Sequence, residues 1–229
     1  MKNRRKTLCI LLAVVMLAGI VPAYAAADST ESFDDVKPGD WYYDAVMTLT
    51  EGGLFHGYGN GKFGPDDTIT WGQFQLVMSR LTWGQAYGDE SGIDLNTDMN
   101  KMVMTRGLTA VQMVKTYNKY CFGYYSYPNN TFTSVDDFPD SADIINWCYI
   151  YQTELYPLVN NGAHIMGADM DSARSAATNY ILKSYTLNMF KGVDDKGTFA
   201  PYVSLTRAQF CQILYNMGWL TADCEYFTK

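Results

Sequence analysis

Residues 54–74 read LFHGYGNGKFGPDDTITWGQF, and residues 189–210 read MFKGVDDKGTFAPYVSLTRAQF. When one extra residue is allowed in the second loop, the glycine, proline, threonine and aromatic positions of the two stretches coincide. The correspondence extends to Trp83 and Trp219. Agreement at so many positions with special backbone or packing demands is not expected by chance. The chain therefore contains a duplicated unit.

Each copy is predicted to be a helix, a glycine-rich loop and a second helix. In the first copy, residues 41–52 carry apolar side chains at helical spacing, and two glycines end that helix. Thr70 stands before the second helix with Gln73 three residues later, which predicts a capping box. Thr206 and Gln209 repeat this device in the second copy.

Partial copies of the unit lie between the two complete ones. Residues 105–114 resemble a second helix, although Leu108 stands where a capping box needs Gln or Glu. Two further stretches, 138–158 and 173–188, each have the apolar spacing of a first helix. The middle of the chain is therefore expected to repeat the unit in a degenerate form.

The pattern predicts a mainly α fold, because no segment alternates convincingly between apolar and polar residues as a strand would. The polar segments 84–100 and 122–134 are predicted as connecting loops. We divide the chain into a signal peptide (1–25), a linker (26–32), a first repeat (33–83), a degenerate second repeat (84–130) and a third repeat with an insertion (131–229).

The first residues have the layout of a secretory signal peptide. Basic residues within positions 2–6 precede an apolar run over 8–21, and Ala23-Tyr24-Ala25 forms an A-x-A cleavage site. The alternative is a membrane anchor, but the apolar run is shorter than the roughly 20 residues that span a bilayer. We expect the mature chain to be exported, with no transmembrane segment.

The charge balance excludes nucleic acid as a general partner. Residues 1–25 hold four of the 17 basic side chains and no acidic one, so 13 basic residues stand against 24 acidic ones in the mature chain. A protein of this balance repels phosphate backbones and anionic lipid.

Export makes the cysteines relevant, since disulfides persist outside the cell. Cys121, Cys148, Cys211 and Cys224 remain after cleavage, and sequence alone does not choose between free thiols and disulfides. Cys148 and Cys211 fall in helical patterns, where buried free thiols are the simpler expectation. Because no CxxC and no Cys/His cluster is present, neither zinc nor any cofactor is predicted.

A set of residues resembles a repeat of the S-layer homology (SLH) family. The stretch 205–209, Leu-Thr-Arg-Ala-Gln, is similar to the family's I-T-R-A-E motif, and residues 104–107 match it less closely. The likeness covers essentially the whole mature chain, strongly at 33–83 and 189–219. The first repeat carries it on Phe33-Asp34-Asp35-Val36, Trp41-Tyr42, Ala45-Val46, Gly53-Leu54, Gly57-Tyr58, Gly61, Phe63, Pro65 and Ile69-Thr70.

The resemblance implies a fold, a ligand and a location. SLH repeats are expected to pack as a three-pronged spindle with pseudo-threefold symmetry. The family holds exported proteins non-covalently on the bacterial cell wall, commonly through secondary cell-wall polysaccharide that carries pyruvylated sugars. The ligand is expected in grooves between repeats, so the resemblance implies a cell-surface or S-layer protein without catalytic activity.

The resemblance also implies site residues. Arg106 and Arg207 match the motif arginine, whereas Trp71 stands at that place in the first repeat. The family's tryptophan matches Trp41 and, less closely, Trp147. The remaining predicted polysaccharide-binding residues are the loop glycines and the motif threonine, Gly57, Gly192 and Thr206.

The chemistry of these residues agrees with an anionic sugar ligand. Arginine offers a planar fork suited to a carboxylate, and both arginines sit in the first turn of a helix, where the positive dipole end favours an anion. Two alternatives stay open: each arginine pairs with a surface carboxylate of this acidic chain, and Trp41 and Trp147 are ordinary core residues.

Two other functions compete with wall binding. An exported wall hydrolase needs a poised base or nucleophile, and only two histidines are present, with no nucleophile-elbow pattern. A degenerate SLH fold that binds a protein partner is the stronger rival, through the tyrosine cluster Tyr117, Tyr120, Tyr124, Tyr125 and Tyr127. Nothing in the sequence predicts the oligomeric state.

Overall fold

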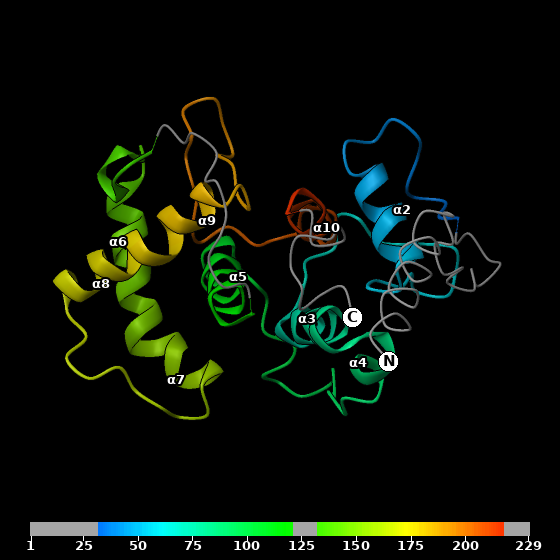
Figure 1. Cartoon of the computed structure of the whole chain (residues 1–229), viewed down its shortest axis with the longest axis horizontal. Helices are drawn as coiled ribbons and strands as arrows, with labels where there is room; N and C mark the ends of the chain where they lie inside the picture. Colours follow the sequence, from blue (N-terminus) through cyan, green and yellow to red (C-terminus); the bar gives the residue numbers. More distant parts are fainter. Residues whose placement is uncertain (1–31, 121–131, 218–229) are drawn as a thin grey trace, which may run out of the picture. The chain divides into compact units, whose positions relative to one another are not determined.

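A computed structural model describes residues 32–120 and 132–217, so the predicted signal peptide, most of the tyrosine cluster and Trp219 lie outside the described residues. Within these ranges the chain forms helices and isolated β-bridges but no β-strand, which confirms the mainly α class (Figure 1). The helices are α2 (Tyr43–Glu51), α3 (Trp71–Trp83), α4 (Gln85–Asp89), α5 (Arg106–Tyr120), η1 (Val135–Asp137), α6 (Ser141–Ile150), η2 (Tyr151–Leu155), α7 (Tyr156–Val159), α8 (Met170–Ala177), η3 (Thr178–Leu182), α9 (Lys183–Thr186) and α10 (Arg207–Asn216).

The helix starts follow the predicted capping signals. Thr70 and Thr206 each accept a hydrogen bond from the N–H of the glutamine three residues on, and that glutamine's side chain accepts from the threonine N–H. Before α5, the Thr105 hydroxyl accepts from the Leu108 N–H, at 3.3 Å, but leucine returns no bond. The two full capping boxes and the half-formed third are therefore confirmed.

The segment 84–100 differs from its prediction as a loop, because it begins with the short helix α4. Arg80 of α3 explains the difference: its Nε donates to Asp89 at 2.8 Å, and its Nη1 donates to the Leu54 carbonyl at 3.1 Å. A methyl group at Gly88 would lie 2.3 Å from the Arg80 side chain, so the glycine permits this close packing. A single arginine thus fastens α4 against α3.

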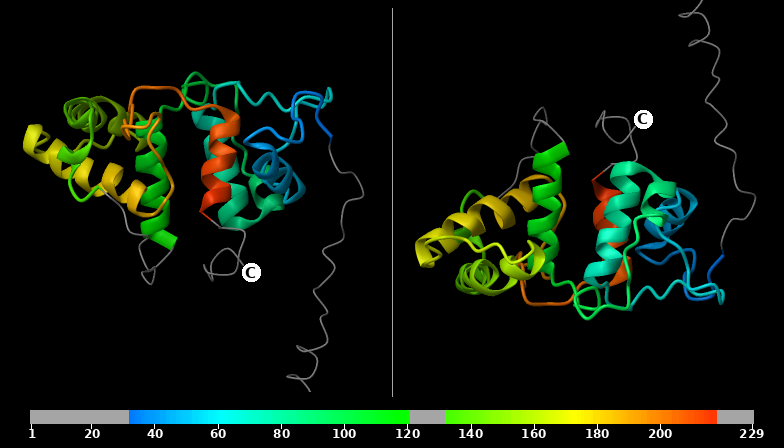
Figure 2. Two further views of the ribbon diagram at one scale, coloured as in Figure 1. Left: turned by 90° about the horizontal axis from the view of Figure 1, so that it is seen from above. Right: turned by 90° about the horizontal axis from the view of Figure 1, so that it is seen from below.

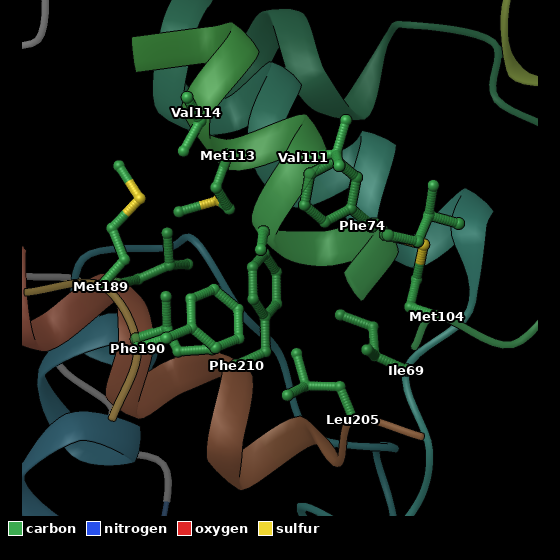
Figure 3. Close-up of a cluster of buried hydrophobic side chains, with 14 of the residues drawn as sticks. Ile69, Phe74, Met104, Val111, Met113, Val114, Met189, Phe190, Leu205 and Phe210 are labelled. Carbon is green, nitrogen blue, oxygen red and sulfur yellow. The ribbon is translucent and has the colours of Figure 1, made fainter. Parts of the chain in front are cut away.

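Three short segments hydrogen-bond to one another in a closed ring. The N–H of Ile69 donates to the Leu205 carbonyl, that of Leu205 to the Met104 carbonyl, and that of Met104 to the Ile69 carbonyl, each at 2.9 Å. All three side chains are buried and come together in the core (Figure 3). Each segment leads directly into a helix, so the ring sets the starting points of α3, α5 and α10.

The first turn of each of these helices is bonded to a loop of another part of the chain. The N–H groups at 207 and 208 donate to the Asp67 and Pro65 carbonyls, and those at 106 and 107 donate to the Val203 and Pro201 carbonyls. The N–H groups at 71 and 72 donate to the Met102 and Asn100 carbonyls. The pattern repeats three times around the ring, while the three-pronged spindle as a whole stays a prediction.

Both stretches that resemble a first helix are helical, and each supplies part of one repeat. Asp140, just before α6, accepts hydrogen bonds from the N–H groups of Phe199 and Ala200, as Asp35 does from those of Phe63 and Gly64. The helix that leads into the second loop is instead the continuous run α8, η3 and α9, and Asn188, which follows it, lies in the left-handed region at φ 56°. In the first repeat Asp35 shortly precedes α2, the helix that leads into its loop. In the later repeat the insertion separates Asp140 from α8, η3 and α9, which lead into the second loop.

The core runs between the second helices of the units. The rings of Phe74 and Phe210 have centroids 5.3 Å apart, and Figure 2 shows α10 beside α3.

Cys148 and Cys211 are buried free thiols, which confirms the simpler expectation for these two cysteines. In the described ranges, no helix combines the length and apolar character needed to traverse a bilayer.

Candidate functional site

Arg207 lies inside the glycine-rich loop of the first repeat, although the two are far apart in the sequence. Its Nε donates to the Phe63 carbonyl at 3.0 Å and its Nη2 donates to the His56 carbonyl at 2.9 Å. The guanidinium carbon lies 4.5 Å from the centroid of the Phe63 ring. We call this arrangement the Arg207 slot.

The outer side of the Arg207 slot is formed by Tyr58 and Asp67. The Tyr58 ring centroid is 4.8 Å from the guanidinium carbon, and its hydroxyl donates to Asp67 Oδ2 at 2.8 Å. Tyr58 is 48% exposed, so one part of its ring remains available to a ligand. Burial and the bond to Asp67 raise the pKa of Tyr58, and Arg207 acts in the opposite direction.

Arg207 retains hydrogen-bonding capacity in this position. Its Nη1 forms no hydrogen bond within the described residues, and it is not among the side-chain atoms sealed from solvent without a partner. A guanidinium has five N–H donors, and the two loop carbonyls occupy two of them. The slot therefore fixes the orientation of the fork and leaves donors for an anion.

Arg106 occupies the corresponding place in the second glycine-rich loop. Its Nε donates to the Phe199 carbonyl and its Nη2 to the Lys191 carbonyl, both at 2.8 Å. The guanidinium carbon lies 5.2 Å from the Phe190 ring centroid and 5.3 Å from that of Phe199. We call this the Arg106 slot. Burial lowers the pKa of Arg106, and the nearby Tyr185 and Asp140 oppose that shift.

Both arginines are buried, and neither forms an ion pair within the described residues, where the salt bridges are Arg80–Asp89 and Arg174–Asp136. The alternative that each arginine pairs with a surface carboxylate is therefore wrong for the described part of the chain. Backbone carbonyls of a neighbouring loop take that role. This arrangement holds the repeats together whether or not a ligand is bound.

The third position of the ring holds Trp71 in place of an arginine. Trp71 is buried and its ring stacks on Phe74, with centroids 5.8 Å apart and an interplanar angle of 13°. The loop opposite it approaches closely, since a methyl group at Gly72 would lie 2.8 Å from Asn100 Cβ. An apolar ring packed in this way offers no charged donor, so this position lacks the guanidinium that the two slots have.

The two predicted tryptophans lie in different environments. Trp41 is 63% exposed and its ring meets Tyr42 edge to face, with centroids 5.1 Å apart. Trp147 is buried, stacks on Tyr151 and covers Gly107, where a methyl group would lie 2.5 Å from the indole. The core alternative therefore describes the surroundings of Trp147, and Trp41 has a ring face available to a sugar.

The other predicted residues have structural roles that bring the slots together. A methyl group at Gly57 would lie 2.5 Å from the Phe33 ring, and one at Gly192 would lie 2.4 Å from Gly197 Cα. Thr206 caps α10 directly before Arg207. These residues shape the loops and helix start, and their contact with a ligand stays a prediction.

Sequence reasoning missed the residues that line and support the Arg207 slot. The second copy has Val193 and Val203 at the places of Tyr58 and Asp67, so the duplication did not mark these two residues. Tyr58 and Asp35 both belong to the stretches that resemble the family, but neither was predicted as a site residue. The pairing of Asp35 with the loop N–H groups needed three-dimensional information.

Comparison with known proteins gives a family match in the first repeat. Residues 32–74 match the S-layer homology domain, a domain type that implies association with a bacterial cell surface. No solved structure matches the chain.

Two curated relatives are similar to the chain. An endoglucanase of Bacillus sp. (strain KSM-635) is 23% identical over 98% of this chain and 23% of its own length. A cellulosome-anchoring protein of Acetivibrio thermocellus is 32% identical over 47% of this chain and 23% of its own length. The chain thus spans about a quarter of each relative. What the comparisons establish is an S-layer homology domain at residues 32–74, which contains Trp41, Tyr58 and the carbonyls that receive Arg207.

Proposed function

We propose that the protein is exported and attaches non-covalently to the bacterial cell wall by binding an anionic, pyruvylated secondary cell-wall polysaccharide at the Arg207 slot. The observation that carries this proposal is the arginine fork held by two loop carbonyls, whose Nη1 has no hydrogen bond to any described residue and lies beside the exposed ring of Tyr58. Attachment would place the protein at the cell surface, within the wall or S-layer.

The chemistry of a pyruvyl ketal fits this arrangement. Its carboxylate needs charged N–H donors, and a guanidinium whose orientation is already fixed loses less conformational entropy on binding than a mobile one. The sugar ring that carries the ketal has an apolar face, which suits the exposed rings of Tyr58 and Trp41. Local contacts of this kind are needed because the acidic chain repels an anionic polymer at long range.

The comparisons support an anchoring role. The S-layer homology match covers the loop side of the slot, and one relative is named a cellulosome-anchoring protein. An endoglucanase is also similar, so glycan hydrolysis is the rival function. We propose a non-catalytic protein, and expect no release of reducing sugar from carboxymethylcellulose or purified walls under conditions in which the protein binds walls.

The experiment is a pull-down of the mature chain, residues 26–229, on purified bacterial walls with and without extraction of the secondary polymer. The variants are Trp41→Ala, Tyr58→Val and Arg207→Lys, and the control is Tyr149→Ala, an exposed aromatic residue of α6. Lysine keeps the charge of Arg207 but loses the fork. An alanine at 207 is less informative, because it also removes the bonds that hold the loop.

Binding should disappear when the polymer is extracted, and should fall at least fivefold in Trp41→Ala, Tyr58→Val and Arg207→Lys but not in Tyr149→Ala. Equal binding to extracted walls would contradict a polymer ligand. Undiminished binding by all three slot variants, with loss in a tyrosine-cluster variant, would support the rival in which a protein partner is bound.

A further inference from the structure

A second group of basic and aromatic side chains lies where α5 packs along η3 and α9. Lys115 Nζ donates to the Tyr151 hydroxyl at 2.7 Å. The same ammonium lies 4.7 Å from the Tyr156 ring centroid and 6.0 Å from that of Tyr180. Three tyrosine rings thus surround one lysine.

Lys183 extends this group by one helical turn. It follows Tyr180 by three residues on the η3–α9 run, and its Nζ donates to Asn118 Oδ1, three residues after Lys115 on α5. Residues three apart on an α-helix share a face, so Asn118 lies one turn beyond Lys115 on α5. The two lysines therefore lie on adjacent turns of packed helices, and we call this group the lysine–tyrosine cluster.

The lysine–tyrosine cluster lacks a negative partner within the described ranges. No carboxylate there lies within 4 Å of either ammonium, since the ion pairs involve Arg80 and Arg174 only. The hydrogen bonds of Lys115 and Lys183 use one of the three donors that each ammonium has. No other lysine of the described ranges forms an ion pair either, so the tyrosine rings that surround the ammonium are what distinguish this group.

We propose that the lysine–tyrosine cluster is a binding site for an anionic glycan, separate from the arginine slots. The carboxylates of acidic sugars would pair with Lys115 and Lys183, and their ring faces would pack on the partly exposed rings of Tyr156 and Tyr180. Lys115 follows Arg106 by nine residues on α5, or roughly 13 Å along the axis at 1.5 Å per residue. Lys115 therefore lies more than two helical turns from Arg106 on α5.

Burial lowers the pKa of Lys115, and no charged group acts against this shift. A half-buried ammonium without a counter-ion gains more from a carboxylate than a solvated one does, because the pair interacts in a medium of lower effective dielectric. We therefore expect Lys115 to contribute more to binding than Lys183.

The test is calorimetric titration of the mature chain with tetragalacturonate, which carries carboxylates, and with neutral galactotetraose of the same length. Sodium acetate serves as the small anion. The variants are Lys115→Gln, Lys183→Gln and the double variant, and the controls are Lys62→Gln and Lys196→Gln, two exposed loop lysines. Far-UV circular dichroism and the unfolding midpoint verify that each variant is folded, and Lys115→Met replaces Lys115→Gln if the latter is not.

The wild type should bind tetragalacturonate at least tenfold more tightly than the neutral tetrasaccharide or acetate. The double variant should lose at least tenfold in affinity, while the loop controls stay within twofold of the wild type. The proposal is overturned by equal affinity for the neutral sugar or for acetate, by wild-type affinity in the double variant, or by no heat of binding at 10 mM tetragalacturonate. Because this titration uses neither cell walls nor the secondary polymer and mutates neither Arg207 nor Tyr58, its result can be interpreted even if the wall-binding proposal fails.

Discussion

The Arg207 slot and the Arg106 slot have the same backbone bonds but different surroundings. In both, Nε and Nη2 of a buried arginine donate to two carbonyls of a glycine-rich loop, and an aspartate accepts from two N–H groups of that loop. In the Arg207 slot, an exposed Tyr58 tied to Asp67 covers the guanidinium. The second slot has Val193 and Val203 at the corresponding positions, both about half exposed.

This difference separates the structural role that both motif arginines share from the binding role that we propose for Arg207. The shared bonds join distant parts of the chain, so we expect both arginines to stabilise the fold. The features suited to a sugar, an exposed ring and an unpaired donor beside it, come together in the Arg207 slot. An arginine in the motif is therefore insufficient evidence of a ligand site without the residues around it.

The largest expected effect tests the shared structural role. Arg106→Met and Arg207→Met should each lower the free energy of unfolding by about 3 kcal/mol, because each removes two charge-assisted hydrogen bonds and leaves two loop carbonyls without those donors. Urea denaturation monitored by tryptophan fluorescence measures the loss. A loss below about 1 kcal/mol in either variant would show that the two slots are not structurally equivalent.

A second prediction concerns position 107, where the first arginine helix has glycine and α10 has Ala208. Gly107→Ala should destabilise the protein by about 1–3 kcal/mol, since the new methyl group would lie 2.5 Å from the buried Trp147 indole. Thermal unfolding gives the measurement. Adding Trp147→Leu should restore part of the loss, and failure of this rescue would mean that the strain arises elsewhere.

The third prediction concerns the aspartate clamp of the Arg207 slot. Burial acts to raise the pKa of Asp35, but the N–H groups of Phe63 and Gly64 together with Lys62 hold it below its usual value. The clamp's stabilisation is therefore complete above the unfolded-state pKa, near 4, and is lost as the pH falls through the lower folded-state pKa.

Asp35→Asn should accordingly cost about 1 kcal/mol at pH 7, because the partly exposed carboxylate gives up two charge-assisted bonds, and should make stability less dependent on pH below pH 4. Urea midpoints at pH 3 and pH 7 measure both effects. An unchanged pH dependence in the variant would assign the acid sensitivity to other carboxylates.

The smallest expected effect on stability concerns Tyr58, the residue that distinguishes the Arg207 slot from the Arg106 slot. Tyr58→Val copies the residue of the other slot and should lower stability by about 0.5–1 kcal/mol, the usual size of an exposed cation–π contact. Wall binding should fall much more than stability. If binding and stability fell in proportion, Tyr58 would act on the fold of the loop rather than on the ligand.

Much of the fold could be predicted from the sequence, because local rules determine it. The two capping boxes, the helix before the first loop and the duplicated loops all follow from threonine, glutamine, glycine and apolar spacing over short distances. Helix α4 was missed because Arg80, rather than a local pattern, holds it in place.

The site was harder to predict for the same reason. Arg106 and Arg207 were identified, but the sequence did not show that their guanidinium groups would be buried in loops from other repeats. Trp41 and Trp147 had the same pattern, and packing against Gly107 places one of them in the core. Long-range partners distinguish such residues, and a single sequence does not contain them.

The ring of Ile69, Met104 and Leu205 has a consequence for how the chain folds. The loop of the first repeat receives its arginine from a residue 144 positions later, so this repeat is complete only when nearly all of the described chain is present. Contacts of such large sequence separation close slowly, since the intervening chain must be ordered first. The helices of the first repeat would therefore remain incompletely packed until α10 is present.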